Sequence, residues 1–210
     1  MASVYIDLEK FVGAPLQRDP FDHVMVPGFV RADRLDEVGG DYPPIARPGN
    51  FPVEQLHGGP AFHALVAELT GPEFRQAIAT KLGLPLDGLH TIVTVRAFVE
   101  AGDGKIHTDV AAKLVTALVY MNTDWTTSGG RLRLLRQPHD IDDYVAEVPP
   151  LAGTLLVFRR SESSWHGWKR YAGPRRSIQI NWTTDAVKAA KQYRRPSLGQ
   201  RLRDLVARPR

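Results

Sequence analysis

The chain has 210 residues, 27 Lys or Arg, 23 Asp or Glu, no cysteine and a formal net charge of +4. This length allows one domain with a sizeable core, and the lack of cysteine excludes disulfides, zinc–thiolate sites and thiol nucleophiles. Because no apolar run approaches membrane-spanning length and the start lacks a signal-peptide layout, we expect a soluble, cytoplasmic protein.

The first 88 residues are expected to give helical support to the rest of the chain. Asp33 is a candidate cap for a short helix that Gly39-Gly40 would end, and residues 41–60, rich in Pro and Gly, favour an ordered loop. Two longer helices are indicated by apolar stripes at helical spacing, the second with Pro72 in its first turn. The expected elements are a short strand at 24–26 and helices at 34–38, 60–69 and 73–82.

From residue 89 to residue 185 the spacing of apolar residues changes from the helical period to the alternation that is typical of strands. Gly- and Pro-rich turns separate five β-like runs, at 91–99, 114–121, 131–135, 154–158 and 177–182. Helices followed by many short strands fit a β-sandwich or distorted barrel with the helices packed on one sheet.

Residues 186–210 form a basic tail, which we expect to be helical. The tail holds eight Lys or Arg and one acid, which leaves 19 basic and 22 acidic residues in residues 1–185. A basic tail can bind nucleic acid or an acidic partner. Aromatic residues do not interleave with these charges in a nucleic-acid-binding pattern, so a solvated helix is favoured over a nucleic-acid-binding segment.

Two histidines and one aspartate occur in an order that indicates a metal site. His107 and Asp109 are two residues apart, so on an extended segment both side chains point to one face. His166 would complete a 2-His-1-carboxylate set, which holds one face of an octahedral metal and leaves three positions open, as in non-haem Fe(II) oxygenases. The alternative to metal binding is that these histidines are core residues with a purely structural role.

A second charged group follows about one strand later. A 2-oxo acid can chelate such an iron and still leave a position for O2, and its distant carboxylate then needs a cation, a task that suits the planar fork of arginine. Alternation puts Arg175 on the face of Ser177 and Gln179, and Arg176 on the apolar face of Ile178. We therefore expect Arg175 to point into a wet cavity, with Arg176 as the fallback.

The sequence resembles the iron/2-oxoglutarate-dependent oxygenase superfamily, and most closely its prolyl-4-hydroxylase-like branch. The resemblance spans about 90 residues and implies a double-stranded β-helix, or jelly roll. It implies Fe(II) on His107, Asp109 and His166, and 2-oxoglutarate on Arg175 with help from Ser177 and Tyr120. The matching motifs are His107-x-Asp109, Leu118-Val119-Tyr120-Met121-Asn122, Gly129-Gly130-Arg131-Leu132, Pro149-Pro150-Leu151-Ala152-Gly153-Thr154-Leu155-Leu156-Val157-Phe158, His166 and Gly173-Pro174-Arg175-Arg176-Ser177-Ile178.

The activity that this resemblance implies is hydroxylation of an unactivated C–H bond, with succinate and CO2 as co-products and ascorbate as a candidate reductant. The expected substrate is a small molecule or a peptide, and no motif in the sequence identifies it. A homodimer is a further possibility that the sequence does not decide. Two alternatives remain, a cupin-like jelly-roll metal-binding protein and a non-catalytic interaction module. Candidate substrate-pocket residues are Arg96, Lys113, Arg131, Trp165, Trp168 and Asn181.

Overall fold

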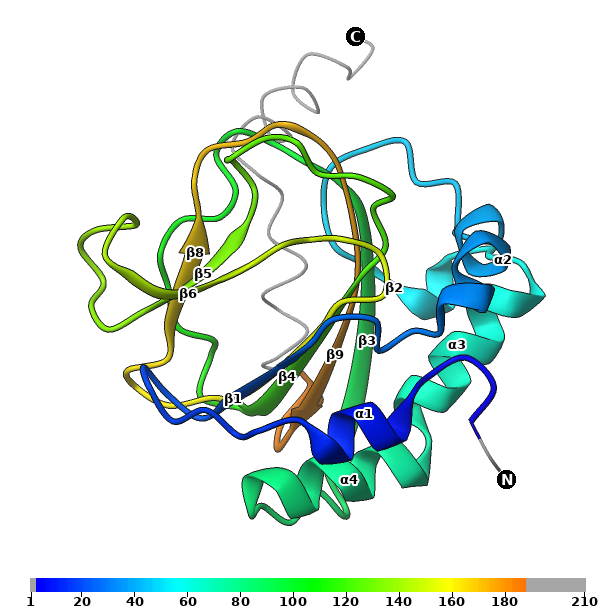
Figure 1. Cartoon of the computed structure of the whole chain (residues 1–210), viewed down its shortest axis with the longest axis horizontal. Helices are drawn as coiled ribbons and strands as arrows, with labels where there is room; N and C mark the ends of the chain where they lie inside the picture. The colour runs from blue at the N-terminus through cyan, green and yellow to red at the C-terminus, as the bar shows by residue number, and fades with distance from the viewer. Residues whose placement is uncertain (1–2, 188–210) are drawn as a thin grey trace, which may run out of the picture.

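The computed structural model describes residues 3–187, so the tail predicted at 186–210 lies almost entirely outside the described residues. Two antiparallel sheets face each other, a six-stranded sheet in the order β1-β7-β4-β9-β3-β2 and a three-stranded sheet in the order β6-β5-β8 (Figure 1). The strands are β1 His23–Val26, β2 Phe51–Pro52, β3 His90–Val99, β4 Lys113–Tyr120, β5 Leu132–Leu135, β6 Tyr144–Val148, β7 Leu155–Arg159, β8 Trp165–Trp168 and β9 Gly173–Thr183.

The helices lie on the face of the six-stranded sheet that is turned away from the three-stranded sheet (Figure 1). This arrangement confirms the predicted jelly roll with N-terminal helices on one sheet. No helix in residues 3–187 is long and apolar enough to cross a membrane. The helices are α1 Leu8–Gly13, α2 Leu35–Gly40, α3 Pro60–Thr70 and α4 Pro72–Leu82, with two 3-10 turns, η1 Ala32–Arg34 and η2 Val53–Gln55.

Helices α3 and α4 begin and end where local chemistry dictates. Pro60 and Pro72 occupy first-turn positions, where a missing N–H costs no hydrogen bond. Gly83 ends α4 with φ of +63°, a left-handed conformation that glycine adopts without steric cost. These signals explain why the sequence placed both helices within one or two residues of their observed bounds.

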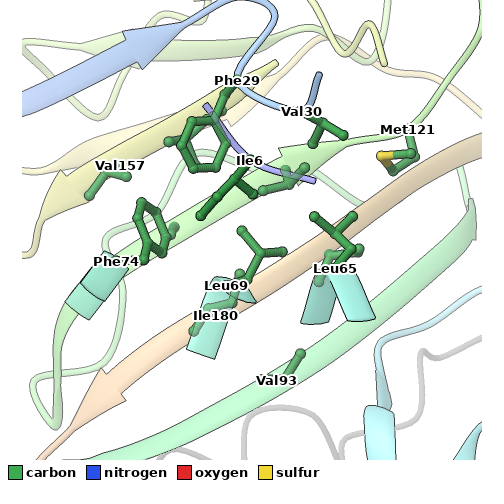
Figure 2. Close-up of a cluster of buried hydrophobic side chains, with 14 of the residues drawn as sticks. Ile6, Phe29, Val30, Leu65, Leu69, Phe74, Val93, Met121, Val157 and Ile180 are labelled. Carbon is green, nitrogen blue, oxygen red and sulfur yellow. The ribbon is translucent and has the colours of Figure 1, made fainter. Parts of the chain in front are cut away.

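The larger core lies between the helices and the six-stranded sheet (Figure 2). Leu65 and Leu69 of α3 and Phe74 of α4 are fully buried against it. The strands contribute alternate residues, among them Val93 of β3 and Ile180 of β9. Each such side chain contributes about 1.5–3 kcal/mol through its burial.

Strand alternation also decides what faces the space between the sheets. Ile178 and Ile180 of β9 pack in the helix-side core, so Arg175, Ser177 and Gln179 must point the other way. The predicted inward orientation of Arg175 is therefore confirmed. A smaller apolar cluster fills part of the space between the sheets: Phe21, Tyr120, Leu132, Leu134, Val148, Leu156 and Phe158.

Three local expectations were wrong or incomplete. Asp33 does not cap a helix: it lies within η1, and α2 begins two residues later at Leu35 without a side-chain cap. The stretch 41–60 is not only loop, because β2 and η2 lie in it. Helix α1 and strands β6 and β8 were not anticipated, because each has six residues or fewer and little internal periodicity.

The packing of Phe74 gives a direct test of the helix–sheet interface. Its ring lies 5.4 Å from that of Phe11 and 5.2 Å from that of Phe29, centroid to centroid. Phe74→Ala should lower the free energy of unfolding by about 3–5 kcal/mol, because it leaves a cavity in a fixed core. Thr80→Ala, on the exposed face of the same helix, should change it by about 0.5 kcal/mol or less. Urea denaturation measures both; equal effects would contradict this packing.

Candidate metal centre

Backbone pairing brings together two histidines from distant parts of the chain. The N–H of His107 donates to the carbonyl of His166 at 3.0 Å, and the N–H of His166 donates back at 2.9 Å. This isolated antiparallel bridge extends the three-stranded sheet beyond β8. Residues paired in this way carry side chains on the same face. The imidazole centroids accordingly lie 4.4 Å apart.

Each imidazole is oriented by the backbone carbonyl of the residue two positions before it. Nδ1 of His107 lies 2.8 Å from the carbonyl oxygen of Lys105, and Nδ1 of His166 lies 2.9 Å from that of Ser164. A carbonyl oxygen only accepts, so each Nδ1 carries the proton and each Nε2 keeps its lone pair. A hydrogen bond of this kind fixes the tautomer of metal-binding histidines.

The carboxylate of Asp109 lies close to the two imidazoles. Ligand atoms of His107, Asp109 and His166 all lie within 4.8 Å of one another, and no other such group of His, Cys, Asp or Glu occurs in residues 3–187. Burial alone raises the pKa of Asp109, but the Lys113 ammonium, His166 and the Thr116 hydroxyl outweigh it and lower the pKa to about 2. The carboxylate is therefore ionised.

His166 is held in the form that a metal requires. Burial lowers its pKa to about 4, and the nearby Asp109 carboxylate opposes this shift only in part. At neutral pH the imidazole is uncharged, and a neutral imidazole is the metal-binding form. Two neutral imidazole nitrogens and one carboxylate therefore fit a ferrous ion held on one face, with its other positions open to the cavity.

A cavity of about 210 Å³ opens from these three residues toward Arg175. Arg175 is 3% exposed, and its Nε donates to the carbonyl of Gly130 at 2.8 Å. The guanidinium carbon lies 4.3 Å from the Trp168 ring centroid. Backbone and indole thus fix a buried cation in the wall of the same cavity, where a carboxylate would find a planar partner.

Tyr120 and Ser177 lie beside this guanidinium. Nη2 of Arg175 donates to the Tyr120 hydroxyl at 3.3 Å. Burial raises the pKa of Tyr120 although Arg175 acts in the opposite direction, so the phenol stays protonated and can donate. Tyr120, Ser177 and Arg96 are direct neighbours in one row across β4, β9 and β3. All three line the cavity.

Comparison with known proteins agrees with this geometry. Residues 94–184 match the sequence profile of the 2OG-Fe(II) oxygenase superfamily. This region is a 2OG-Fe(II) oxygenase domain. The three residues of the candidate metal centre, together with Arg175, Ser177 and Tyr120, fall inside the matched range. The family implies Fe(II), 2-oxoglutarate and O2, so the matched region is that of a 2-oxoglutarate-dependent dioxygenase.

Solved structures share the fold of the oxygenase domain and its helices. A prolyl-4-hydroxylase from Pseudomonas putida is 20% identical with a TM-score of 0.58, over 88% of this chain and 99% of that one. A prolyl 4-hydroxylase from Phytophthora capsici is 18% identical with a TM-score of 0.56, over 98% and 75%. HygX from Streptomyces hygroscopicus, solved with nickel and 2-oxoglutarate, is 12% identical with a TM-score of 0.54, over 77% and 81%. No curated protein sequence matches the chain.

Three of the six predicted substrate-pocket residues line the cavity of the oxygenase domain. Arg96 enters from β3, Lys113 from the start of β4 and Trp168 from β8. Arg96 is held by Asn50, which accepts from its Nε at 2.9 Å, and by Asp103 at 3.6 Å. The cations on the cavity wall are thus already positioned by neighbouring side chains.

The other three predicted pocket residues lie elsewhere. Arg131 points out of the cavity, since it donates to the carbonyls of Thr127 and Trp125 and pairs with Glu147. Trp165 does not line the cavity, because strand alternation in β8 gives that face to His166. Asn181 is fully buried beyond the cavity wall, where its amide donates to Thr116.

Several cavity residues were missed in the sequence. Thr116 could have been found, because it alternates with Leu118 and Tyr120 on the same face of β4. Gln179 was not missed: strand alternation had already placed it on the inward face of Arg175 and Ser177, and it lines the cavity. Asn50 gave no signal, because it lies in an irregular segment with no period to follow.

Close backbone contact makes Gly167 essential to the histidine pair. A Cβ at Gly167 would lie 2.8 Å from the carbonyl oxygen of Gly104 and 3.1 Å from the backbone of Ile106. These backbone atoms immediately precede His107 and cannot move aside without moving it. Only glycine therefore allows the two histidine segments to pair at this distance.

We expect Gly167→Ala to separate the two histidines and weaken metal binding at least about tenfold, because one ligand leaves its position. Gly102→Ala is the matched control, since a Cβ there would meet nothing within 4 Å and φ is not positive. Anaerobic titration with Mn(II) measures both affinities. Unchanged affinity in Gly167→Ala would show that the pairing does not set the ligand geometry.

Proposed function

We propose that the protein hydroxylates an unactivated C–H bond of a small-molecule or peptide substrate. In the overall reaction, R–H, O2 and 2-oxoglutarate give R–OH, succinate and CO2. One oxygen atom enters the alcohol and the other enters succinate. The observation that supports this most is that one cavity joins His107, Asp109 and His166 to the buried guanidinium of Arg175.

Three residues of this chain would hold the iron. His107 and His166 offer Nε2 atoms whose partner nitrogens are already fixed by carbonyls, and Asp109 offers an ionised carboxylate. Bound there, Fe(II) and 2-oxoglutarate supply the oxidative chemistry of O2 activation, for which amino-acid side chains have no equivalent. The protein contributes position, charge and exclusion of water.

Arg175 would bind the distal carboxylate of 2-oxoglutarate. Its Nε is already used by Gly130 and one Nη contacts Tyr120, so the guanidinium can turn little. Tyr120 and Ser177 flank it and each can donate a hydroxyl hydrogen bond to the same carboxylate. A fixed cation with two flanking hydroxyls selects a dicarboxylate of defined length over a longer or uncharged 2-oxo acid.

Apolar side chains form the rest of the cavity near the metal centre. Leu118, Leu132 and Phe158 line it, and the Phe158 ring lies 4.9 Å from that of His166. Such walls restrict water at the reacting centre and strengthen the electrostatic interactions inside. The substrate carbon would be presented at the open side of the centre, with ascorbate as an external reductant for the iron.

Replacing a metal ligand tests the assignment of the iron site. His107→Ala, Asp109→Ala and His166→Ala should each abolish succinate formation from 2-oxoglutarate in the presence of Fe(II) and ascorbate. The fold should persist, because an open catalytic metal site is rarely the main source of stability. His139→Ala changes an exposed histidine away from the cavity and should retain full activity. Full iron occupancy and activity in His166→Ala would refute the assignment.

The two neighbouring arginines give a second test. Arg175→Ala should weaken 2-oxoglutarate binding by about 30-fold to several thousand-fold, since losing one partner of a desolvated charge pair costs about 2–5 kcal/mol. Arg175→Lys should recover only part, because lysine keeps the charge but lacks the fork. Arg176→Ala is the matched control: Arg176 is exposed and its guanidinium lies over the Tyr42 ring.

Calorimetry with Fe(II)-loaded protein in the absence of oxygen measures the affinity for 2-oxoglutarate in all three variants. Loss of binding in Arg176→Ala with normal binding in Arg175→Ala would contradict the proposal, because it would show that 2-oxoglutarate binds on the opposite face of β9.

A further inference from the structure

Both carboxylate oxygens of Asp109 are engaged by side chains from β4. Lys113 Nζ donates to Oδ1 at 3.0 Å, and Thr116 Oγ1 donates to Oδ2 at 2.6 Å. All three side chains are buried, with 0% exposure for Lys113, 1% for Thr116 and 4% for Asp109. Two donors on different oxygens fix the plane of the carboxylate as well as its distance from the histidines.

The direction of the Thr116 hydroxyl is itself determined. Asn181 Nδ2 donates to Thr116 Oγ1 at 2.7 Å, and Gln179 Nε2 donates to Asn181 Oδ1 at 3.0 Å. Because Thr116 accepts from an amide, its own hydrogen points to Asp109. The chain of hydrogen bonds runs in one sense, from Gln179 on the cavity wall through Asn181 and Thr116 to the carboxylate.

Lys113 compensates the charge of Asp109. Its ammonium is fully buried and pairs with a carboxylate that is also buried, so each ion compensates the desolvation of the other. In the protein without metal, Lys113 is a cation that neutralises Asp109 directly. A divalent cation bound by Asp109 would take over much of that role.

We propose that Thr116 and Lys113 preform the metal centre: Thr116 positions Asp109 for the metal, and Lys113 is its counter-ion in the metal-free protein. This inference rests on the proposed function for the location of the metal, and it adds two positioning residues to it.

The test for Thr116 is the Mn(II) affinity of full-length, chelator-treated protein, which requires no turnover. Thr116→Val keeps the shape and removes the hydroxyl, so we expect affinity to fall about 10–100-fold, as for other outer partners of metal ligands. Thr116→Ser keeps the hydroxyl and should restore affinity to near the wild-type value. A loss common to both variants would show that packing alone matters at this position, and an unchanged affinity in Thr116→Val would overturn the positioning role.

Thr94→Val is the matched control. Thr94 is also a buried strand threonine, 1% exposed, but its hydroxyl has no hydrogen-bond partner in the part of the chain that the structure describes. Its replacement should leave Mn(II) affinity unchanged. An equal loss in Thr94→Val and Thr116→Val would attribute the effect to general disturbance of the sheet and overturn the proposal.

The test for Lys113 is the effect of metal on thermal stability. Lys113→Met should lower the Tm of the metal-free protein by about 10 °C, because it leaves a buried carboxylate without its cation. Saturating Mn(II) should then raise the Tm of the variant by more than it raises that of the wild type. An equal rise in both proteins would show that Lys113 stabilises β4 without acting as the counter-ion.

These outcomes are separable from failure of the proposed function. If His166→Ala binds Mn(II) as tightly as the wild type, the metal is not where we place it. If His166→Ala loses binding while Thr116→Val keeps it, the metal centre stands and only the positioning role is overturned.

Discussion

The antiparallel bridge between His107 and His166 is the constraint on which the site depends. Two backbone hydrogen bonds join segments from opposite ends of the strand region and leave both imidazoles on one face. The close approach requires glycine at position 167, next to one ligand. Everything else in the centre is arranged around this pair: the carbonyls that orient the rings, and the Asp109 carboxylate that completes the set.

The six-stranded sheet separates the apolar core on one of its faces from the polar cavity on the other. Its outer face, covered by α3 and α4, holds the large apolar core that stabilises the domain. Its inner face carries charged and polar side chains that would be costly in that core, among them Lys113 and Arg175. Both are buried, and both are compensated: Lys113 by the Asp109 carboxylate, and Arg175 by a carbonyl, a hydroxyl and an indole ring. A jelly roll thus concentrates buried charge along one cavity.

Sequence patterns predicted the parts that depend on period and on local signals. The helices after Pro60 and Pro72, the long strands and the inward orientation of Arg175 follow from amphipathic spacing, first-turn prolines and strand alternation. Pairing partners were not predictable, because the bridge between His107 and His166 leaves no trace in local sequence. Arg131 was a candidate pocket residue, but it pairs with Glu147 outside the cavity, a contact with a residue distant in sequence that no local pattern reveals. Asn50 lines the cavity from an irregular segment that has no period to follow.

A preformed site for one divalent ion is the central claim, and a crystal structure of the protein grown anaerobically with Mn(II) and 2-oxoglutarate tests it most directly. The account predicts one ion bound by Nε2 of His107, Nε2 of His166 and a carboxylate oxygen of Asp109. It also predicts that both Nδ1 atoms keep their hydrogen bonds to the carbonyls of Lys105 and Ser164. An ion bound through Nδ1 after the rings have turned, or bound away from these three residues, would contradict it.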